Sequence, residues 1–265
     1  MHKLAIIGNP VAHSLSPLIW HEFARQTGIE LEYIKIEAPV AEFEAVAQDF
    51  FDAGGHAVNV TAPFKARAFE LAKAHNQHAA DSQTSNLLIN LESGLVADNT
   101  DGLGLVADLS RMNFSLQNKN ILILGSGSVI FSVLSSLTAG NPARIDLLMR
   151  DSSKLSEFKG KSNLIAAYSQ GIAYDLVINT TPNDRANELF ECVKRLSENA
   201  IAYDMSYTSQ QTLFMAAMEK LNANVIQANG IGMLIQQAKV GFELVFGITP
   251  KVDNLYLLLR EKLNG

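Results

Sequence analysis

The chain has 265 residues, of which 48% are hydrophobic and 18% are charged. This composition is typical of a globular protein with one large domain or two domains of ordinary size. The formal net charge of −6 argues against a nucleic-acid-binding protein, because contacts with phosphates require a basic surface. The single cysteine, Cys192, excludes an internal disulfide and is typical of a reducing compartment. We therefore expect a cytoplasmic protein.

We expect neither membrane association nor a metal site. Apolar runs are shorter than the roughly 18 to 20 residues of a membrane-spanning helix, and the first run, 4–8, is too short for a signal peptide. The histidines and the cysteine show no spacing typical of metal ligands. Cys192 would share a helical face with Leu189, Val193 and Leu196, so we expect its side chain to be buried.

Hydrophobic periodicity in the first hundred residues predicts alternating strands and helices. We expect strands at 4–8, 31–38 and 56–62, and helices at 17–28, 41–55 and 64–75. The segment 86–99 is typical of a hairpin that turns at Glu92-Ser93-Gly94. Because a hairpin adds an antiparallel piece, the sequence predicts an N-terminal α/β domain with a mixed sheet.

The alternation becomes more regular after a helix expected at about 103–112. Strands are expected at 120–125, 145–149, 164–168, 175–180, 200–205 and 224–228, and helices at 231–247 and 252–263. Near-continuous apolar strands are typical of a parallel sheet that is covered on both faces. The expected fold is therefore α/β with two domains. The first comprises residues 1–101 plus 238–265, and the second, residues 102–237, is Rossmann-like.

The stretch NILILGSGSVIFSVLSSL (120–137) runs from a buried strand through a glycine-spaced turn into a helix, as dinucleotide-binding βα units do. Gly125 and Gly127 supply the first two glycines of G-x-G-x-x-G, but Ile130 replaces the third. Backbone N–H groups at the start of the helix still attract phosphate, so this change need not abolish binding. The stretch indicates an altered but working cofactor site.

Polar residues gather at strand ends in the first half of the chain, where ligands bind in open α/β folds. They are Ser14 and Ser16 after the first strand, Thr61 and Lys65 after the third, and Asn86 and Asp101 on either side of the hairpin. Each has a structural interpretation: Ser16 would be a good N-cap, Asp101 could start a helix, and Lys65 could be solvated. Their concentration at one end of one sheet favours a ligand site.

The motifs GNPVAHSLSP, NVTAPFK, ADNTDGLGL, INTTP, YDMSY and ANGIGMLIQQA occur in this order over essentially the whole chain. In their order and spacing the chain resembles the shikimate dehydrogenases. The resemblance implies an NADP-dependent oxidoreductase that reduces 3-dehydroshikimate to shikimate, a step of chorismate and aromatic amino-acid biosynthesis. It also implies an N-terminal substrate-binding domain, an NADP-binding domain, and a monomer or homodimer.

The resemblance assigns roles to particular residues. It implies that Lys65 and Asp101 form the catalytic pair and that the substrate is bound by Ser14, Ser16, Thr61, Asn86, Tyr207 and Gln237. It implies cofactor binding by Gly125, Ser126, Gly127, Ser128, Arg150, Lys154, Thr180, Gly230 and Met233. The pair suits the reaction, because a proton must move at the hydroxyl oxygen when a hydride moves at carbon, and a partly buried lysine can exchange that proton. We expect Asp101 mainly to fix the hydroxyl and the ammonium in place.

Departures from the family pattern are concentrated on the cofactor side. Phe131 stands where an arginine is frequent, Met149 replaces an asparagine, and Asn229 replaces an aspartate. The segment 182–186 lacks the glycine and methionine that usually follow the INTTP motif. Asp151 brings negative charge close to the expected 2′-phosphate site, although it could instead cap the following helix.

Two alternatives to the NADP-dependent enzyme remain open. Arg150 and Lys154 favour NADP, but Asp151 could bind the adenosine ribose of NAD in an NAD-preferring quinate/shikimate dehydrogenase. The changes in the glycine loop could also belong to a shikimate-binding pseudo-enzyme with an impaired cofactor site. A protein that only bound the ligand would have little need for both Lys65 and Asp101, which favours an enzyme.

Overall fold

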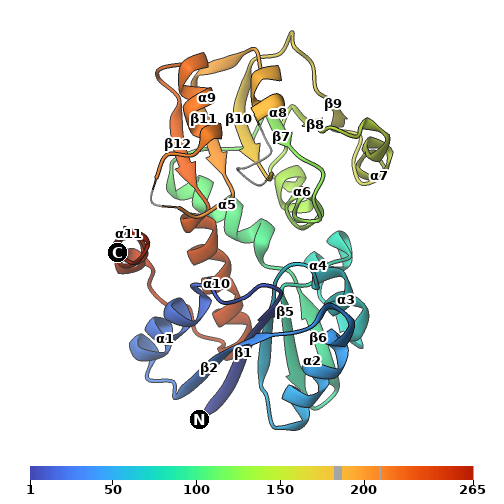
Figure 1. The fold of residues 1–265 in the computed structure, drawn as a ribbon, viewed down its shortest axis with the longest axis vertical. Coiled ribbons are helices and arrows are strands. Elements are labelled where there is room, and N and C mark those ends of the chain that lie inside the picture. Colours follow the sequence, from blue (N-terminus) through green and yellow to red (C-terminus); the bar gives the residue numbers. More distant parts are fainter. Residues whose placement is uncertain (182–186, 209, 265) are drawn as a thin grey trace. The chain divides into compact units, whose positions relative to one another are not determined.

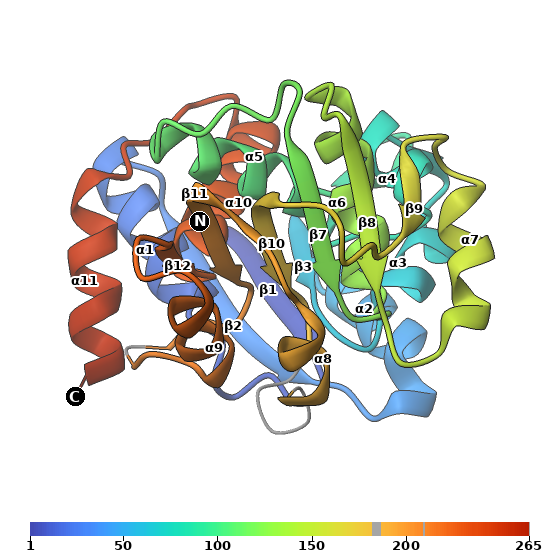
Figure 2. The same cartoon turned by 90° about the horizontal axis from the view of Figure 1, so that it is seen from above.

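The computed structural model describes residues 1–181, 187–208 and 210–264. The chain divides into two compact units, residues 1–105 with 234–259 and residues 106–233 with 260–265. Each unit contains one six-stranded sheet with helices packed on it (Figures 1 and 2), and the expected α/β class is confirmed. The expected boundaries at 101/102 and 237/238 lie within α5 (Asp101–Arg111) and α10 (Ile231–Phe246), and so do the unit boundaries at 105/106 and 233/234. The third unit boundary, 259/260, lies within the last helix, α11 (Asp253–Asn264), which was expected to belong wholly to the first domain. Over the described residues, no helix combines the length and apolar character needed to cross a membrane.

The first unit holds a mixed sheet in the order β2-β1-β3-β5-β6-β4. Its strands are β1 (His2–Gly8), β2 (Leu31–Glu37), β3 (Ala57–Val60), β4 (Ala74–His75), β5 (Leu87–Leu91) and β6 (Gly94–Asp98). β1 pairs in parallel with β2 and β3, whereas β5 runs antiparallel to both β3 and β6. The expected hairpin is therefore present, and it makes the sheet mixed.

Helices flank this sheet (Figure 1). The helices that belong to this unit in whole or in part are α1 (Ser16–Thr27), the 3-10 helix η1 (Val40–Glu42), α2 (Phe43–Asp52), α3 (Lys65–Leu71), α4 (Gln77–Ser82), α10 and α11 (Asp253–Asn264). Phe43 of α2 and Phe64, which directly precedes α3, are buried in one apolar cluster with Val60 of the sheet. α1 and α10 pack against each other through Trp20 and Phe242, whose ring centroids are 5.5 Å apart. Burial of these aromatic rings stabilises the unit.

The helix expected at 64–75 ends earlier, at Leu71. The Lys73 N–H donates to the Leu95 carbonyl oxygen at 2.9 Å, and Ala74 pairs in parallel with Val96. The chain thus leaves the helix to add β4 to the edge of the sheet, and α4 follows. Neither short element was expected, because the helical spacing of apolar residues continues beyond Leu71 and gives no sign of the sheet contact.

The second unit holds a parallel sheet in the order β12-β11-β10-β7-β8-β9 (Figure 2). Its strands are β7 (Asn120–Leu124), β8 (Arg144–Leu148), β9 (Ile165–Ala167), β10 (Tyr174–Asn179), β11 (Leu196–Asp204) and β12 (Ile226–Asn229). Its helices, besides parts of α5 and α10, are α6 (Val129–Ala139), η2 (Ser152–Lys154), α7 (Leu155–Lys159), α8 (Asn187–Cys192) and α9 (Leu213–Leu221). α8 and α9 bury Phe190 and Phe214 against Leu122 and Val177. The expected Rossmann-like sheet is confirmed.

The prediction that Cys192 is buried is wrong, because its side chain is exposed. The prediction assumed that a helix continues through Leu196. Instead α8 ends at Cys192 and Leu196 is the first residue of β11. Without a continuing helix, Cys192 does not share a buried face with its neighbours in the sequence.

Acidification is expected to destabilise the first unit through His56. Burial, followed by the nearby His2, lowers the pKa of His56, whose ring stacks on Phe246 at a centroid distance of 5.8 Å. Because the unfolded chain binds this proton more readily than the folded protein, stability is lost as the pH falls below about 6.5. We expect His56→Gln to reduce the fall in Tm between about pH 7.5 and about pH 5.5. Thermal unfolding measures the effect. His21→Gln, at an exposed histidine of α1, is the control and should keep the slope of the wild type; an unchanged slope in His56→Gln would contradict the prediction.

Candidate active site

The topology of the first sheet brings several strand ends to one edge. The carboxyl ends of β1 and β3 lie side by side because these strands pair in parallel. β5 runs antiparallel to β3 and therefore starts at the same edge, where β6 ends. The polar residues predicted from the sequence in this unit that flank these four ends are Ser14, Ser16, Thr61, Lys65, Asn86 and Asp101. The fold thus places the expected substrate residues of β1, β3, β5 and β6 along one edge.

Lys65 and Asp101 form an ion pair at this edge. Lys65 is the first residue of α3 and Asp101 the first residue of α5. Their Nζ and Oδ2 atoms are 2.5 Å apart, and the two side chains are only 17% and 9% exposed. Lys65 is therefore not a solvated lysine, and Asp101 does more than start a helix.

Asn86 joins this pair to α10. Its Nδ2 amide lies within hydrogen-bonding distance of Asp101 Oδ1 (2.8 Å), Thr100 Oγ1 (3.0 Å) and Gln237 Oε1 (3.3 Å). Its Oδ1 atom accepts the Thr100 backbone N–H at 2.9 Å. The other end of Gln237, Nε2, donates to the Leu234 carbonyl oxygen at 3.0 Å. Asn86, Asp101 and Gln237, which are far apart in the sequence, thus form one buried cluster.

The two serines have different environments. Ser14 Oγ accepts the Ser16 backbone N–H at 3.2 Å, and Ser16 is the first residue of α1 rather than its N-cap, so the capping interpretation of Ser16 is wrong. The Tyr33 phenol, which lies near Ser16, donates to Asn59 Oδ1 at 2.7 Å. Burial raises the pKa of Tyr33 well above its usual range, with the hydrogen bond from Ser16 acting in the opposite direction, so the phenol stays protonated.

Thr61 approaches the backbone of the first strand closely. Its backbone N–H donates to the Ile7 carbonyl oxygen at 3.0 Å, which extends the pairing of β3 with β1. A Cβ atom added at Gly8 would lie 2.4 Å from Thr61 Cγ2. Glycine at position 8 therefore makes room for the Thr61 side chain.

Sequence reasoning missed several buried polar residues around the pair. Thr100 Oγ1 donates to Gln237 Oε1 at 3.2 Å, and Asn99 Oδ1 accepts the Asp101 backbone N–H at 3.2 Å. Both residues belong to the ADNTDGLGL motif, so the sequence contained a signal for them. Tyr33 gave no such signal, because its strand alternates between the two faces like any half-buried strand.

The glycine loop of the second unit is tight at its first glycine and open at its second. Gly125 has a φ of +117°, and a Cβ atom there would lie 2.4 Å from Thr180 Oγ1. The Thr180 hydroxyl itself donates to the Leu124 carbonyl oxygen at 2.7 Å. At Gly127 an added Cβ would meet no atom within 4 Å, and Ser128 at the start of α6 is exposed while Ser126 is half-buried. The loop therefore leaves the open approach to a helix N-terminus that a dinucleotide pyrophosphate requires.

The unusual residues that follow the loop serve packing. Ile130, in place of the third glycine, is fully buried in α6. Phe131, where the family often has arginine, stacks on Phe158 of α7 at a centroid distance of 4.5 Å. These substitutions thus fill space beneath and beside the helix rather than block its N-terminus.

Arg150 and Lys154 are exposed after β8, which pairs with β7, so they follow the same sheet edge as the glycine loop. Asp151 caps η2, because its Oδ1 atom accepts the Ser153 backbone N–H at 3.1 Å and the Ser153 hydroxyl at 2.5 Å. These hydrogen bonds from Ser153 lower the pKa of Asp151, so its carboxylate stays charged. The expectation that Asp151 caps the following helix is confirmed. Residues 182–186, whose departure from the family pattern was noted, lie outside the described residues.

The remaining expected residues follow β11 and β12. A Cβ atom at Gly230 would lie 2.2 Å from the Met205 carbonyl oxygen, so only glycine fits there. Met233 is buried in α10, and its backbone N–H donates to the Tyr203 hydroxyl at 3.1 Å. Tyr207 keeps 39% of its surface exposed after β11.

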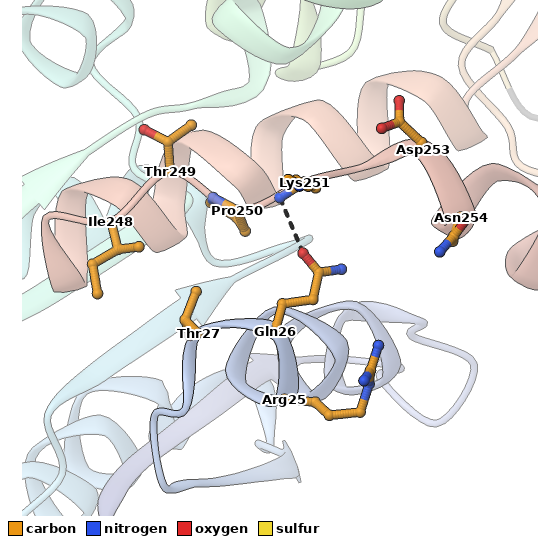
Figure 3. A pocket seen from close by; sticks show the side chains of 9 residues that line it. All are labelled: Arg25, Gln26, Thr27, Ile248, Thr249, Pro250, Lys251, Asp253 and Asn254. Atoms are coloured by element: carbon orange, nitrogen blue, oxygen red, sulfur yellow. Dashed lines mark hydrogen bonds between the residues drawn. The ribbon is translucent and has the colours of Figure 1, made fainter.

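A cavity of about 530 Å³ in the first unit lies elsewhere (Figure 3). It is lined by the last turn of α1, including Gln26, and by the segment that leads into α11, including Lys251. Gln26 Oε1 accepts the Lys251 backbone N–H at 3.1 Å across it (Figure 3). Its lining shares no residue with the Lys65–Asp101 cluster, so we do not assign it to the active site.

Comparison with known proteins identifies the family. Residues 6–88 match the family described as the shikimate dehydrogenase substrate binding domain. Proteins named shikimate dehydrogenase (NADP(+)) are 37% identical in Nitrosomonas europaea and 36% identical in Aromatoleum aromaticum, with 99% of this chain and 98% of each relative covered. The fold is also that of shikimate 5-dehydrogenase from Thermus thermophilus, solved in complex with shikimate, with a TM-score of 0.86, 23% identity and full coverage (100%) of both chains. The chain belongs to the shikimate dehydrogenase family.

Proposed function

We propose that the chain is an NADP-dependent shikimate dehydrogenase, an oxidoreductase that reduces 3-dehydroshikimate to shikimate and catalyses the reverse reaction. The observation that carries this proposal is the Lys65–Asp101 ion pair, held with Asn86 and Gln237 in one buried cluster of a chain from this family. A ligand-binding protein without chemistry gains little from a buried charge pair, because desolvating the two charges is costly.

NADPH supplies the hydride when it is bound. The Lys65 ammonium has three N–H donors, and its ion pair with Asp101 Oδ2 uses one of them. A second donor is available for the oxygen of the substrate carbonyl, which becomes negative as hydride reaches carbon. Lys65 then gives this oxygen its proton, and in the oxidative direction it takes the proton from the hydroxyl. Asp101 holds the ammonium in position through the 2.5 Å contact.

Ser14 and Ser16 are the proposed ligands of the substrate carboxylate, with Tyr207 as the predicted third contributor. Hydroxyl groups suit a carboxylate because each can donate one hydrogen bond. Thr61, Asn86 and Gln237 are proposed to bind the ring hydroxyls, since their side chains both donate and accept.

The residues of the second unit fit NADP. The open side of the loop at Gly127, with Ser126 and Ser128, is proposed to take the pyrophosphate at the N-terminus of α6. Arg150 and Lys154 are proposed to bind the 2′-phosphate, because both are exposed cations next to that loop. Asp151 stays charged but is used as a helix cap. Gly125, Thr180, Gly230 and Met233 are proposed to shape the remainder of the cofactor site.

The reaction is tested directly in the reductive direction. The purified protein should consume NADPH in the presence of 3-dehydroshikimate, and chromatography should show shikimate accumulating in equal amount. NADPH consumption without shikimate would contradict the proposed product. Absence of turnover, combined with calorimetric binding of shikimate, would make the protein a binder instead.

A further inference from the structure

A second buried polar cluster lies beside the Lys65–Asp101 pair, and the chemistry proposed above does not use it. It consists of Ser82, Thr84 and Asn99, whose exposed fractions are 3%, 4% and 1%. Ser82 ends α4, Thr84 lies in the loop before β5, and Asn99 follows β6. Polar groups buried this deeply are costly unless they are hydrogen-bonded, so their bonding pattern indicates what they stabilise.

The bonds of the cluster form a chain that ends at Asp101. Thr84 Oγ1 donates to Ser82 Oγ at 3.0 Å and accepts from Asn99 Nδ2 at 2.7 Å. The other end of the Asn99 amide, Oδ1, accepts the Asp101 backbone N–H at 3.2 Å. Since Asp101 is the first residue of α5, this N–H belongs to a helix start, where a side-chain acceptor fixes the direction of the first turn.

The same loop, residues 82–86, also holds the other member of the pair. The Ser85 backbone N–H donates to the Lys65 carbonyl oxygen at 2.8 Å, and the next residue, Asn86, donates to Asp101 Oδ1 at 2.8 Å. Thr84, Ser85 and Asn86 therefore contact Asn99, Lys65 and Asp101 respectively. One short segment thus fixes the backbone of Lys65, the carboxylate of Asp101 and, through Asn99, the backbone of Asp101.

We infer that Thr84 is a positioning residue, which acts through Asn99 to hold Asp101 at the correct distance from Lys65. This inference rests on the proposed function. The Thr84 hydroxyl keeps the Asn99 amide in the orientation that offers Oδ1 to Asp101. Without the hydroxyl, Asn99 loses the 2.7 Å contact of its amide, the start of α5 loosens, and the carboxylate no longer holds the ammonium in one place. A small misplacement of a catalytic group costs up to about 100-fold in rate, whereas the proposed substrate contacts of Ser14, Ser16 and Thr61 stay in place.

Thr84→Val tests the inference, because valine keeps the shape of threonine and removes only the hydroxyl. We expect kcat for shikimate oxidation with NADP⁺ to fall by roughly 10-fold or more, with the calorimetric Kd of shikimate changed by less than about 3-fold. Thr84→Ser retains the hydroxyl and should restore most of kcat. The matched control is Thr27→Val, because the Thr27 hydroxyl donates to the carbonyl oxygens of Phe23 and Ala24 in its own helix. This variant should keep the kcat of the wild type.

Amide hydrogen exchange provides a readout that does not depend on turnover. In Thr84→Val, the peptide that contains residues 99–105 should exchange faster than in the wild type, and Thr84→Ser should not. Thr84→Ala serves the same purpose if the valine variant does not fold. If Thr84→Val lowers Tm but leaves both kcat and this exchange unchanged, Thr84 has only a general structural role and the inference is wrong. Absence of turnover in the wild type would instead contradict the proposed function, while faster exchange in the variant would still support the positioning of Asp101.

Discussion

Replacing Lys65 by alanine is expected to lower kcat for shikimate oxidation roughly a thousand-fold, because the proton acceptor at the hydroxyl is lost. The ion pair with Asp101 is 2.5 Å long and largely shielded from water. Asn86 and Gln237, which complete the cluster, carry amides and cannot replace the ammonium. Asn86 still donates to Asp101 Oδ1 and partly compensates the carboxylate, so we expect the variant to fold. Initial rates of NADPH formation measure the effect, and Lys73→Ala, at an exposed lysine of the same unit, is the control.

Lys65→Arg separates the proton transfer from the charge. Arginine keeps the positive charge next to Asp101 but is not deprotonated in proteins, so it cannot exchange the proton. We expect this variant to bind shikimate within about 10-fold of the wild type while its kcat stays near that of the alanine variant. An arginine variant with nearly full kcat would show that Lys65 acts only through its charge, and it would contradict the proposed mechanism.

The two glycines of the cofactor loop should respond differently to alanine. Gly125→Ala places a Cβ atom 2.4 Å from Thr180 Oγ1, on a residue whose φ of +117° other amino acids rarely adopt. We expect a loss of about 2 to 3 kcal/mol in unfolding free energy, together with weaker NADP⁺ binding. Gly127→Ala meets no atom within 4 Å in the folded protein, so its stability should match the wild type. Its added methyl group would face the proposed pyrophosphate position, and we expect only the Kd of NADP⁺ to rise.

Chemical denaturation and calorimetric titration with NADP⁺ measure these two effects separately. The Gly127 variant is the matched control for the Gly125 variant, since both make the same chemical change two residues apart. If Gly127→Ala bound NADP⁺ as tightly as the wild type, the loop would not lie at the pyrophosphate. If Gly125→Ala were as stable as the wild type, the strain attributed to position 125 would be absent.

Much of the fold follows from local patterns in the sequence. The buried strands and amphipathic helices repeat with the periods of 2 and 3.6 that predict them, and the hairpin at 86–99 is marked by its turn residues. Errors arose where a contact distant in sequence overrides the local pattern. Lys73 leaves the helix to bond with Leu95, and α8 stops at Cys192 because the chain enters β11. Periodicity does not report such contacts.

The candidate site was predictable where a motif names the residue and unpredictable where a residue acts through a neighbour. Lys65 and Asp101 stand in motifs shared with the family, and the topology of the sheet explains why they meet Asn86. Tyr33 and Thr84 act through Ser16 and Asn99, and these pairings depend on side-chain directions at strand ends. Neither spacing nor composition encodes those directions, so the supporting hydrogen bonds appear only in three dimensions.

We propose that this chain oxidises and reduces shikimate compounds with NADP as its cofactor. The most direct test is the absorbance of reduced nicotinamide with shikimate, comparing NADP⁺ and NAD⁺ on one preparation of the wild type. We predict turnover with NADP⁺ and a higher kcat/KM for NADP⁺ than for NAD⁺, because Arg150 and Lys154 follow the strand next to the glycine loop. A preference for NAD⁺ would assign the adenosine ribose to Asp151 and contradict the cofactor assignment, and no turnover with either cofactor would contradict the enzyme itself.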